Sequence, residues 1–156
     1  MPDIENFSSF DNSTGFAGAK IGFGGVTPDA SMSWLKNQGY VTVINLRLAG
    51  EEGVDIECSR DAAEAAGLNY IHLPFSAKEL DQQLIGEFLA TLGDSANQPV
   101  YIHCRSATRV AALWIIGRVL RDNWELEATR EEADAIAQKP DDALAFATAY
   151  IKSHQS

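Results

Sequence analysis

Short apolar segments alternate with amphipathic ones along most of the chain, and polar or glycine-containing turns separate them. Segments rich in Val, Ile, Leu and aromatic residues are typical of strands, and we predict strands at 20–23, 40–46, 68–73 and 99–103. The segment 40–46 is β-branched and largely apolar, which indicates a strand that is buried on both faces.

Apolar residues spaced three and four positions apart predict helices in the remaining segments. We expect them at 27–37, 56–66, 77–92, 110–120, 126–138 and 141–153. Thr27 is placed to cap the first of these helices, because Pro28 follows it in the first turn. The helix at 110–120 is apolar at most positions, so we expect it to be largely buried.

The alternation of strands and helices predicts an α/β fold, with a central, mainly parallel sheet of four to five strands flanked by helices. A chain of 156 residues with 46% hydrophobic positions is long and apolar enough for one domain with its own core. We assign residues 16–156 to this single domain. Residues 1–15 are rich in Ser, Asn and Asp, and we predict a flexible N-terminal arm there.

The formal net charge of −10, with no run of Lys and Arg, argues against a nucleic-acid surface or an anionic-membrane surface. No apolar run is long enough to span a bilayer, and the N-terminus lacks the features of a signal peptide. We therefore expect a soluble protein that lies in the cytoplasm. A periplasmic location stays open if a signal peptide was removed. The oligomeric state is left open.

The two cysteines, Cys58 and Cys104, form neither a disulfide framework nor a zinc-binding pattern. We expect no metal and no cofactor. Cys104 lies between a predicted buried strand and a predicted buried helix. Ligands bind at such junctions in α/β sheets, because the helix N-terminus offers unpaired N–H groups and a positive dipole.

The residues after Cys104 indicate an anion-binding site. A helix N-terminus and neighbouring arginines favour a reactive thiolate, so we predict that Cys104 is a nucleophile. A cysteine is often only a small buried apolar residue, but two arginines, a serine and a threonine follow this one within five positions. We expect Arg109 to clamp two oxygens of a phosphate-like group. The expected substrate-binding residues are Arg105, Ser106, Ala107 and Thr108.

The segment 103–109, His-Cys-Arg-Ser-Ala-Thr-Arg, resembles the phosphate loop of cysteine-dependent phosphatases of the dual-specificity and tyrosine type. It resembles more closely a bacterial phosphatase-like family related to the extra domain of β-lactamase-like hydrolases. Segments 26–29, 34–40, 43–47, 65–74 and 111–114 are also similar to that family, and the likeness covers about residues 19–136.

This resemblance implies a cysteine-phosphatase-like fold and the hydrolysis of phosphomonoesters. The substrate would be a small anion or a phosphorylated side chain. The Cys104 thiolate would attack phosphorus, while Arg109 and the loop amides would hold the equatorial oxygens. Water would then hydrolyse the phosphocysteine intermediate.

The loop differs from the phosphatase pattern in its length and at two residues. Four residues separate Cys104 from Arg109, where ordinary phosphatases have five. Ala107 occupies a position where glycine is usual, and alanine is strained wherever the backbone needs a positive φ. Val110 follows the arginine, where the phosphatases usually carry Ser or Thr.

Two alternatives to phosphatase chemistry therefore stay open. The four-residue spacing is that of rhodanese-like sulfurtransferases, in which Cys104 would carry a persulfide from a sulfur donor to a thiol or cyanide acceptor. The other alternative is a non-catalytic module that binds anions through the same loop.

Two further residues are candidates to support this loop. His103 precedes the nucleophile, and we expect it to point away from the substrate and to orient the loop through a hydrogen bond. Arg47 follows a predicted strand at the same edge of the sheet, so it either faces the cleft or pairs with Glu51 or Glu52.

A phosphatase of this type normally has a general acid on a neighbouring loop, and the loop after Pro74 is the place to look for it. Glu79 and Asp81 are the candidates in that loop. The alternative is that both carboxylates lie in the first turn of the following helix, where they would complement its dipole.

Overall fold

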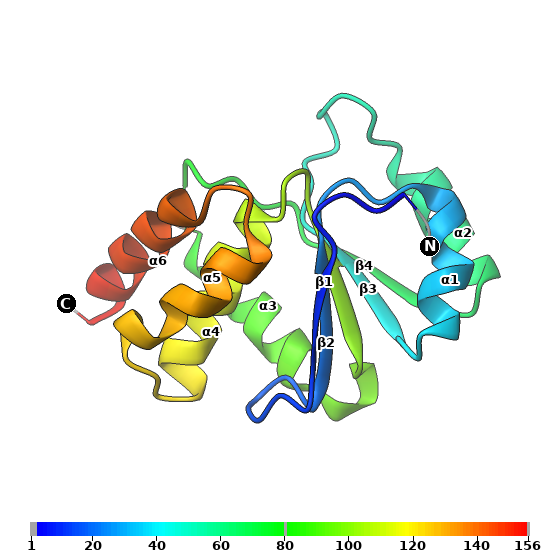
Figure 1. The fold of residues 1–156 in the computed structure, drawn as a ribbon. Coiled ribbons are helices and arrows are strands. Elements are labelled where there is room, and N and C mark those ends of the chain that lie inside the picture. Colours follow the sequence, from blue (N-terminus) through cyan, green and yellow to red (C-terminus); the bar gives the residue numbers. More distant parts are fainter. Residues whose placement is uncertain (1–2, 80, 156) are drawn as a thin grey trace.

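The computed structural model describes residues 3–79 and 81–155. Its strands form one sheet in the order β1-β2-β5-β3-β4 (Figure 1). Their bounds are β1 (Ser8–Asp11), β2 (Lys20–Gly24), β3 (Thr42–Asn45), β4 (Asn69–His72) and β5 (Val100–His103). Only the β1–β2 pair among these is antiparallel. The prediction of a mainly parallel sheet in an α/β fold is confirmed.

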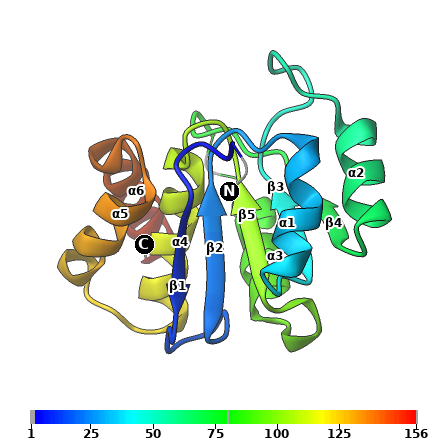
Figure 2. The same ribbon diagram turned by 45° about the vertical axis from the view of Figure 1, so that its right-hand side comes forward.

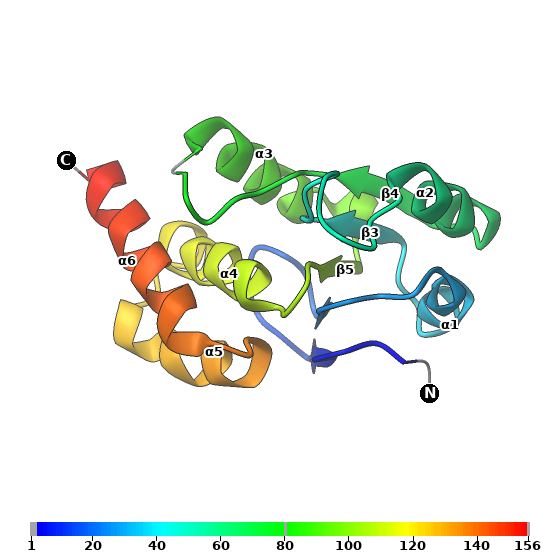
Figure 3. The same cartoon turned by 90° about the horizontal axis from the view of Figure 1, so that it is seen from above.

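Helices cover both faces of this sheet, as Figure 3 shows from above. Their bounds are α1 (Met32–Asn37), α2 (Ile56–Ala65), α3 (Gln82–Gly93), α4 (Thr108–Arg121), α5 (Arg130–Ile136) and α6 (Pro140–Gln155). Helices α1 and α2 pack on one face with Val43 and Tyr101, and the other four helices pack on the opposite face with Ile44 and Ile102. Leu80, which belongs to the predicted helix 77–92, lies outside the described residues.

Part of the segment predicted as a flexible arm lies in the sheet. Strand β1 pairs with β2 at the sheet edge (Figure 2), and it brings Phe10 against Phe23 and Trp114 at centroid distances of 5.2 and 6.3 Å. Pairing supplies partners for backbone groups of β2 that would otherwise be left open at an edge. The polar composition of this segment does not indicate a strand, because only one of the four residues in β1 is apolar.

The helix predicted at 27–37 begins later than expected. Pro28 is extended, a short 3₁₀ turn covers Asp29–Ser31, and α1 follows. The Thr27 hydroxyl does not cap this turn; its Oγ1 donates to the carbonyl of Gly25 at 3.0 Å and lies 2.6 Å from the Tyr101 hydroxyl. The predicted cap therefore ties the end of β2 to the neighbouring strand β5.

Helix α4 is the central helix of its layer, and it is buried as the sequence predicts. Arg118 is only 2% exposed, and its guanidinium is 4.6 Å from the Trp114 ring and 4.2 Å from the Trp124 ring. It forms ion pairs with Asp122 and Glu132 at 2.9 Å each. These contacts fix the helix whose N-terminus carries the candidate site.

Candidate active site

The segment from Cys104 to Ala107 connects strand β5 with helix α4 at the carboxyl edge of the sheet. The Cys104 amide donates to the carbonyl of Gly24 at 3.2 Å, and the Leu46 amide donates to the carbonyl of His103 at 2.9 Å. Both neighbours of β5 therefore hold the start of the loop in place. This is the junction at which the sequence predicts an anion site.

Two carbonyl groups of the loop accept hydrogen bonds from neighbouring segments. The Arg105 carbonyl accepts from the Val26 amide at 3.1 Å, and the Ser106 carbonyl accepts from the Gln138 amide at 3.2 Å. None of the hydrogen bonds recorded for the described residues uses the amides of Arg105, Ser106 or Ala107. Free amides with engaged carbonyls are what a backbone anion nest requires.

Gly25 allows the close approach on which one of these bonds depends. A Cβ at this position would lie 2.6 Å from the carbonyl oxygen of Arg105. Only glycine lets the end of β2 run this close to the loop.

Ala107 adopts the left-handed conformation, with φ 62° and ψ 3°, immediately before α4. The strain expected for a non-glycine residue at this position is therefore present. Beside it, the Thr108 Oγ1 accepts from the Ser106 hydroxyl at 3.2 Å and from the Lys139 amide at 3.2 Å. The loop is thus braced against the connection between α5 and α6.

Cys104 is fully buried, and its side chain belongs to the core on the α4 side of the sheet. Arg109, the second residue of α4, interacts with it. Burial alone lowers the pKa of Arg109, but its hydrogen bonds and charge interaction with Glu51, together with its interaction with Cys104, raise the pKa above its ordinary value. The guanidinium therefore stays charged beside the sulfur.

Glu51 holds the Arg109 fork with both carboxylate oxygens. Its Oε2 accepts from Nη1 at 2.6 Å and its Oε1 accepts from Nη2 at 2.9 Å, while Nη1 also donates to the Phe75 carbonyl at 3.2 Å. Burial alone raises the pKa of Glu51, but the Arg109 and Leu48 hydrogen bonds and the Arg109 charge lower it to about 2. Sequence reasoning named Glu51 only as a partner of Arg47, and it missed this pairing.

Arg47 is almost fully buried and pairs with the loop that follows it, which is the second of the two roles considered for it. Its Nε donates to Glu51 at 3.3 Å, and its Nη2 donates to the carbonyl of Glu52 at 2.9 Å. Arg47 and Arg109 thus share the Glu51 carboxylate. Among the described residues, the recorded contacts connect Arg47 to Arg109 only through the Glu51 carboxylate.

His103 points to the opposite face of the sheet from Cys104, and it stacks on Tyr101 at a centroid distance of 5.9 Å. The expected hydrogen bond to the loop is not present: within the described chain, neither ring nitrogen has a partner at hydrogen-bonding geometry. Burial, followed by the charge of Arg47, lowers the pKa of His103 to about 3; the nearby Cys104 backbone opposes this shift without reversing it. The imidazole is therefore neutral.

The two candidate general acids lie outside the loop. Asp81 caps α3 by accepting from the Leu84 amide at 3.0 Å, and Glu79 is exposed in the preceding turn. No contact recorded for residues 3–79 and 81–155 joins either carboxylate to the segment 104–109. The Asp81 contact is a helix-capping role.

No group of three or more His, Cys, Asp or Glu side chains among the described residues has an arrangement that could hold a metal ion. None of the helices that the structure describes is long and apolar enough to cross a membrane.

Comparison with known proteins points to phosphatases. Residues 25–121, more than half of the chain, match the family described as "Beta-lactamase hydrolase-like protein, phosphatase-like domain". A beta-lactamase hydrolase-like protein of Xylella fastidiosa (strain Temecula1) is 33% identical over 122 residues, which cover 74% of this chain and 26% of the relative. The chain spans about a quarter or less of the length of such curated relatives.

Solved phosphatase structures share the fold. The core catalytic domain of the PP-IP phosphatase Siw14 from Saccharomyces cerevisiae, in complex with citrate, superposes with a TM-score of 0.70 at 22% identity, over 94% of this chain and 85% of that chain. TpbA from Pseudomonas aeruginosa, in complex with phosphotyrosine, gives a TM-score of 0.62 at 18% identity, over 84% and 85% of the two chains.

Proposed function

Because the chain belongs to the phosphatase-like family of beta-lactamase hydrolase-like proteins, we propose that it hydrolyses phosphomonoesters through Cys104, as tyrosine and dual-specificity phosphatases do. One observation carries the proposal: the loop 104–109 combines a buried thiol, free amides and a charged arginine at the N-terminus of α4. Such a loop matches the charge and shape of a phosphoryl group.

The proposed reaction has two steps. The Cys104 thiolate attacks phosphorus, an S–P bond forms, and the P–O bond to the leaving group breaks. Water then attacks phosphorus, breaks the S–P bond and releases inorganic phosphate with the thiolate restored. Arg109 and the amides of residues 105–108 stabilise the charge on the equatorial oxygens in both transition states.

Glu51 and Arg47 act as positioning residues in this proposal. The carboxylate of Glu51 fixes the plane of the Arg109 guanidinium, and Arg47 in turn holds the carboxylate. The guanidinium keeps N–H groups that these bonds do not use, and these are available to a phosphate. A pre-oriented fork loses less freedom when it binds its ligand.

We further propose that aryl phosphates are the preferred substrates. Neither Glu79 nor Asp81 contacts the loop in the described residues, so neither of these two acids stands ready to protonate a leaving group. Aryl oxides depart as relatively stable anions and need little protonation. Alkyl phosphates need that proton and should react more slowly by roughly 10²–10⁴-fold.

Sulfur transfer is the second candidate, and the four-residue spacing between Cys104 and Arg109 is the observation that favours it. The same free amides and the same arginine would hold the sulfonate oxygens of a sulfur donor such as thiosulfate. Cys104 would then attack the outer sulfur, release sulfite and carry a persulfide to an acceptor thiol or cyanide.

A side-by-side assay separates the two reactions. We expect the wild type to release phosphate from an aryl phosphate, and Cys104→Ser and Arg109→Ala to lose this activity, because they remove the nucleophile and the clamp. Efficient sulfur transfer from thiosulfate, with aryl phosphates untouched, would establish the second candidate instead. Anion binding without either reaction would identify a module that has kept the site and lost its chemistry.

A further inference from the structure

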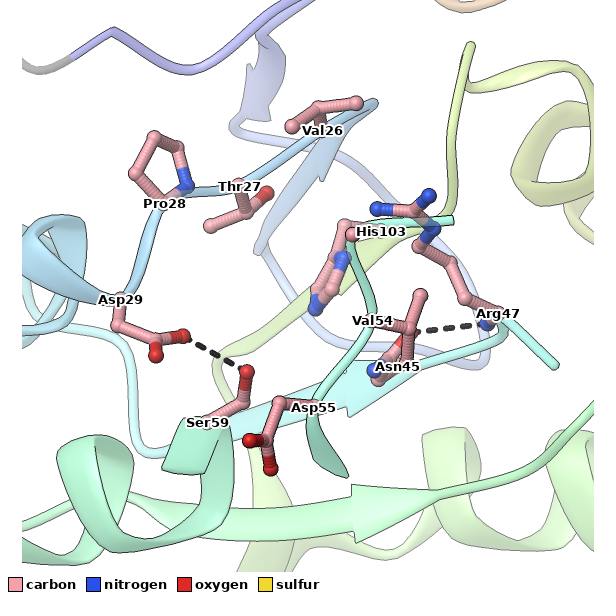
Figure 4. Close-up of a pocket in the computed structure, with 11 residues that line it drawn as sticks. Val26, Thr27, Pro28, Asp29, Asn45, Arg47, Val54, Asp55, Ser59 and His103 are labelled. Atoms are coloured by element: carbon pink, nitrogen blue, oxygen red, sulfur yellow. Dashed lines mark hydrogen bonds between the residues drawn. The ribbon is translucent and has the colours of Figure 1, made fainter. Parts of the chain in front are cut away.

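A pocket of about 290 Å³ adjoins the loop on the α1 and α2 side of the sheet (Figure 4). The Cys104 side chain belongs to the core on the other face. Its walls come from the segments that follow β2 and β3 and from the start of α2, and the end of β5 contributes His103. The polar residues that line it are Thr27, Asp29, Asn45, Arg47, Asp55, Ser59 and His103.

His103 is the unsatisfied group of this pocket. It is 4% exposed, its ring points into the pocket, and both ring nitrogens lack a partner among the described residues (Figure 4). The imidazole is neutral, so it offers one donor and one acceptor. Buried polar groups are nearly always hydrogen-bonded, and an unmade bond is costly, so this ring calls for a ligand.

Two neighbouring polar side chains of the pocket, Thr27 and Asn45, already have partners in the protein. Thr27 bonds to Tyr101, and Asn45 Nδ2 donates to the Tyr70 hydroxyl at 2.8 Å while its Oδ1 accepts from the Arg47 amide at 2.8 Å. Of the fully buried side-chain atoms without a partner in the described chain, only the two His103 ring nitrogens belong to the pocket lining.

Two exposed carboxylates, Asp29 and Asp55, stand on the opposite side of the pocket from His103 (Figure 4). Both act on one thiol: a hydrogen bond and the charge of Asp55, with a contribution from the charge of Asp29, raise the pKa of Cys58. Arg47 lies on the His103 side of the pocket, and it shares the Glu51 carboxylate with Arg109 (Figure 4). The pocket entrance therefore favours a cation.

We propose that this pocket binds a small amino alcohol, with its hydroxyl on the His103 ring and its ammonium group between Asp29 and Asp55. A metal ion is a poorer fit, because these side chains do not form a metal-binding group in the described chain. The pocket would bind a cation and the loop 104–109 an anion, so the pocket and the loop do not compete for one ligand.

Three probes of similar size and different charge test this proposal. Ethanolamine carries an ammonium group, ethylene glycol is neutral and glycolate is an anion. The readout is the ring resonances of His103 in the full-length, isotope-labelled protein, titrated with each probe. We expect ethanolamine to shift these resonances saturably, ethylene glycol to bind more weakly and glycolate to have no effect.

Paired variants test the carboxylates. Asp29→Asn keeps the oxygen that accepts from the Ser59 hydroxyl and removes the charge, so it should weaken ethanolamine binding about two- to fivefold. Asp61→Asn removes the same charge from an exposed position of α2 outside the pocket lining, and it should bind like the wild type.

Several results would overturn the proposal. If no probe shifts the His103 resonances, the ring nitrogens are satisfied by water alone. Tighter binding of glycolate, or equal binding of ethylene glycol and ethanolamine, would show that the carboxylates do not select an ammonium group. Equal affinity of wild type and Asp29→Asn for ethanolamine would lead to the same conclusion.

Discussion

Ala107 carries the backbone strain of the site, and this strain decides the effect of replacing it. Ala107→Gly removes roughly 1–2 kcal/mol of left-handed strain, but it loses a buried methyl group worth about 0.8 kcal/mol and adds about 0.4–1 kcal/mol of unfolded-state entropy. The free energy of unfolding should therefore stay within about 1 kcal/mol of the wild type.

The matched control for this substitution lies one turn further along the chain. Ala111 is equally buried but is part of the regular helix α4, so Ala111→Gly should cost roughly 2 kcal/mol through lost helix propensity and lost burial. Denaturant titration of both variants checks the difference. Equal costs at the two positions would mean that the left-handed strain at Ala107 is negligible.

Glu51 is the residue whose role depends most on tertiary structure. The sequence shows only an acidic residue in a loop, 58 positions before Arg109. Its two bonds to the arginine exist because β3 and β5 are neighbours in the sheet. Sequence reasoning therefore named Cys104 and Arg109 as candidates, because they lie in one segment, and it missed the contact between Glu51 and Arg109.

The lowered pKa of Glu51 predicts a dependence of stability on pH. Its pKa is about 2 in the folded chain, against an ordinary value of 4.5, so the carboxylate stabilises the fold above pH 4.5. This contribution is lost as the pH falls through 4.5 towards 2. We expect a loss of about 1–2 kcal/mol over that range, after allowance for solvent screening.

Glu51→Gln should be less stable than the wild type at neutral pH, and the gap should narrow in acid. Glu52→Gln is the control, because Glu52 contacts Arg47 through its backbone carbonyl. Denaturant titrations at pH 6, 4 and 3 measure both variants. A gap that stays constant between pH 6 and 3 would contradict the assigned pairing of Glu51 with Arg109.

At the scale of elements, hydrophobic patterning located most strands and helices, because strands such as β3 and β5 are buried on both faces and carry Val, Ile and Tyr at their central positions. It failed at β1, where backbone pairing and Phe10 hold a polar segment in the sheet. It also misplaced the start of the helix at 27–37, because the Thr27 hydroxyl bonds to Tyr101 of strand β5 and does not cap the helix.

Arg118 connects several of these elements, and we expect its replacement to lower the stability of the fold. Its guanidinium bonds to Glu132 and Asp122 and to the carbonyl of Thr14, next to the end of the N-terminal segment. Arg118→Met keeps the apolar stem but leaves two largely buried carboxylates unpaired, which should cost about 3–5 kcal/mol. Chemical denaturation measures this, and a cost below about 1 kcal/mol would show that the pairing contributes little.

The whole molecule places two different chemical environments back to back at one edge of the sheet. Successive residues of an extended strand point to opposite faces. Cys104 therefore faces the α4 side, with an arginine and free amides, and His103 faces a pocket with an acidic entrance. The sequence predicted the first environment from one contiguous segment. It did not predict the second, because the lining residues come from four separate segments.

Direct detection of the intermediate tests the central claim at this scale. The chain is mixed with an aryl phosphate and quenched in acid within the first turnover, and its peptides are analysed by mass spectrometry. We predict one phosphoryl group on the peptide that contains Cys104, together with a burst of released aryl alcohol close to one equivalent of protein. Phosphate release without a phosphorylated Cys104, or a Cys104→Ser variant that turns over like the wild type, would contradict the account.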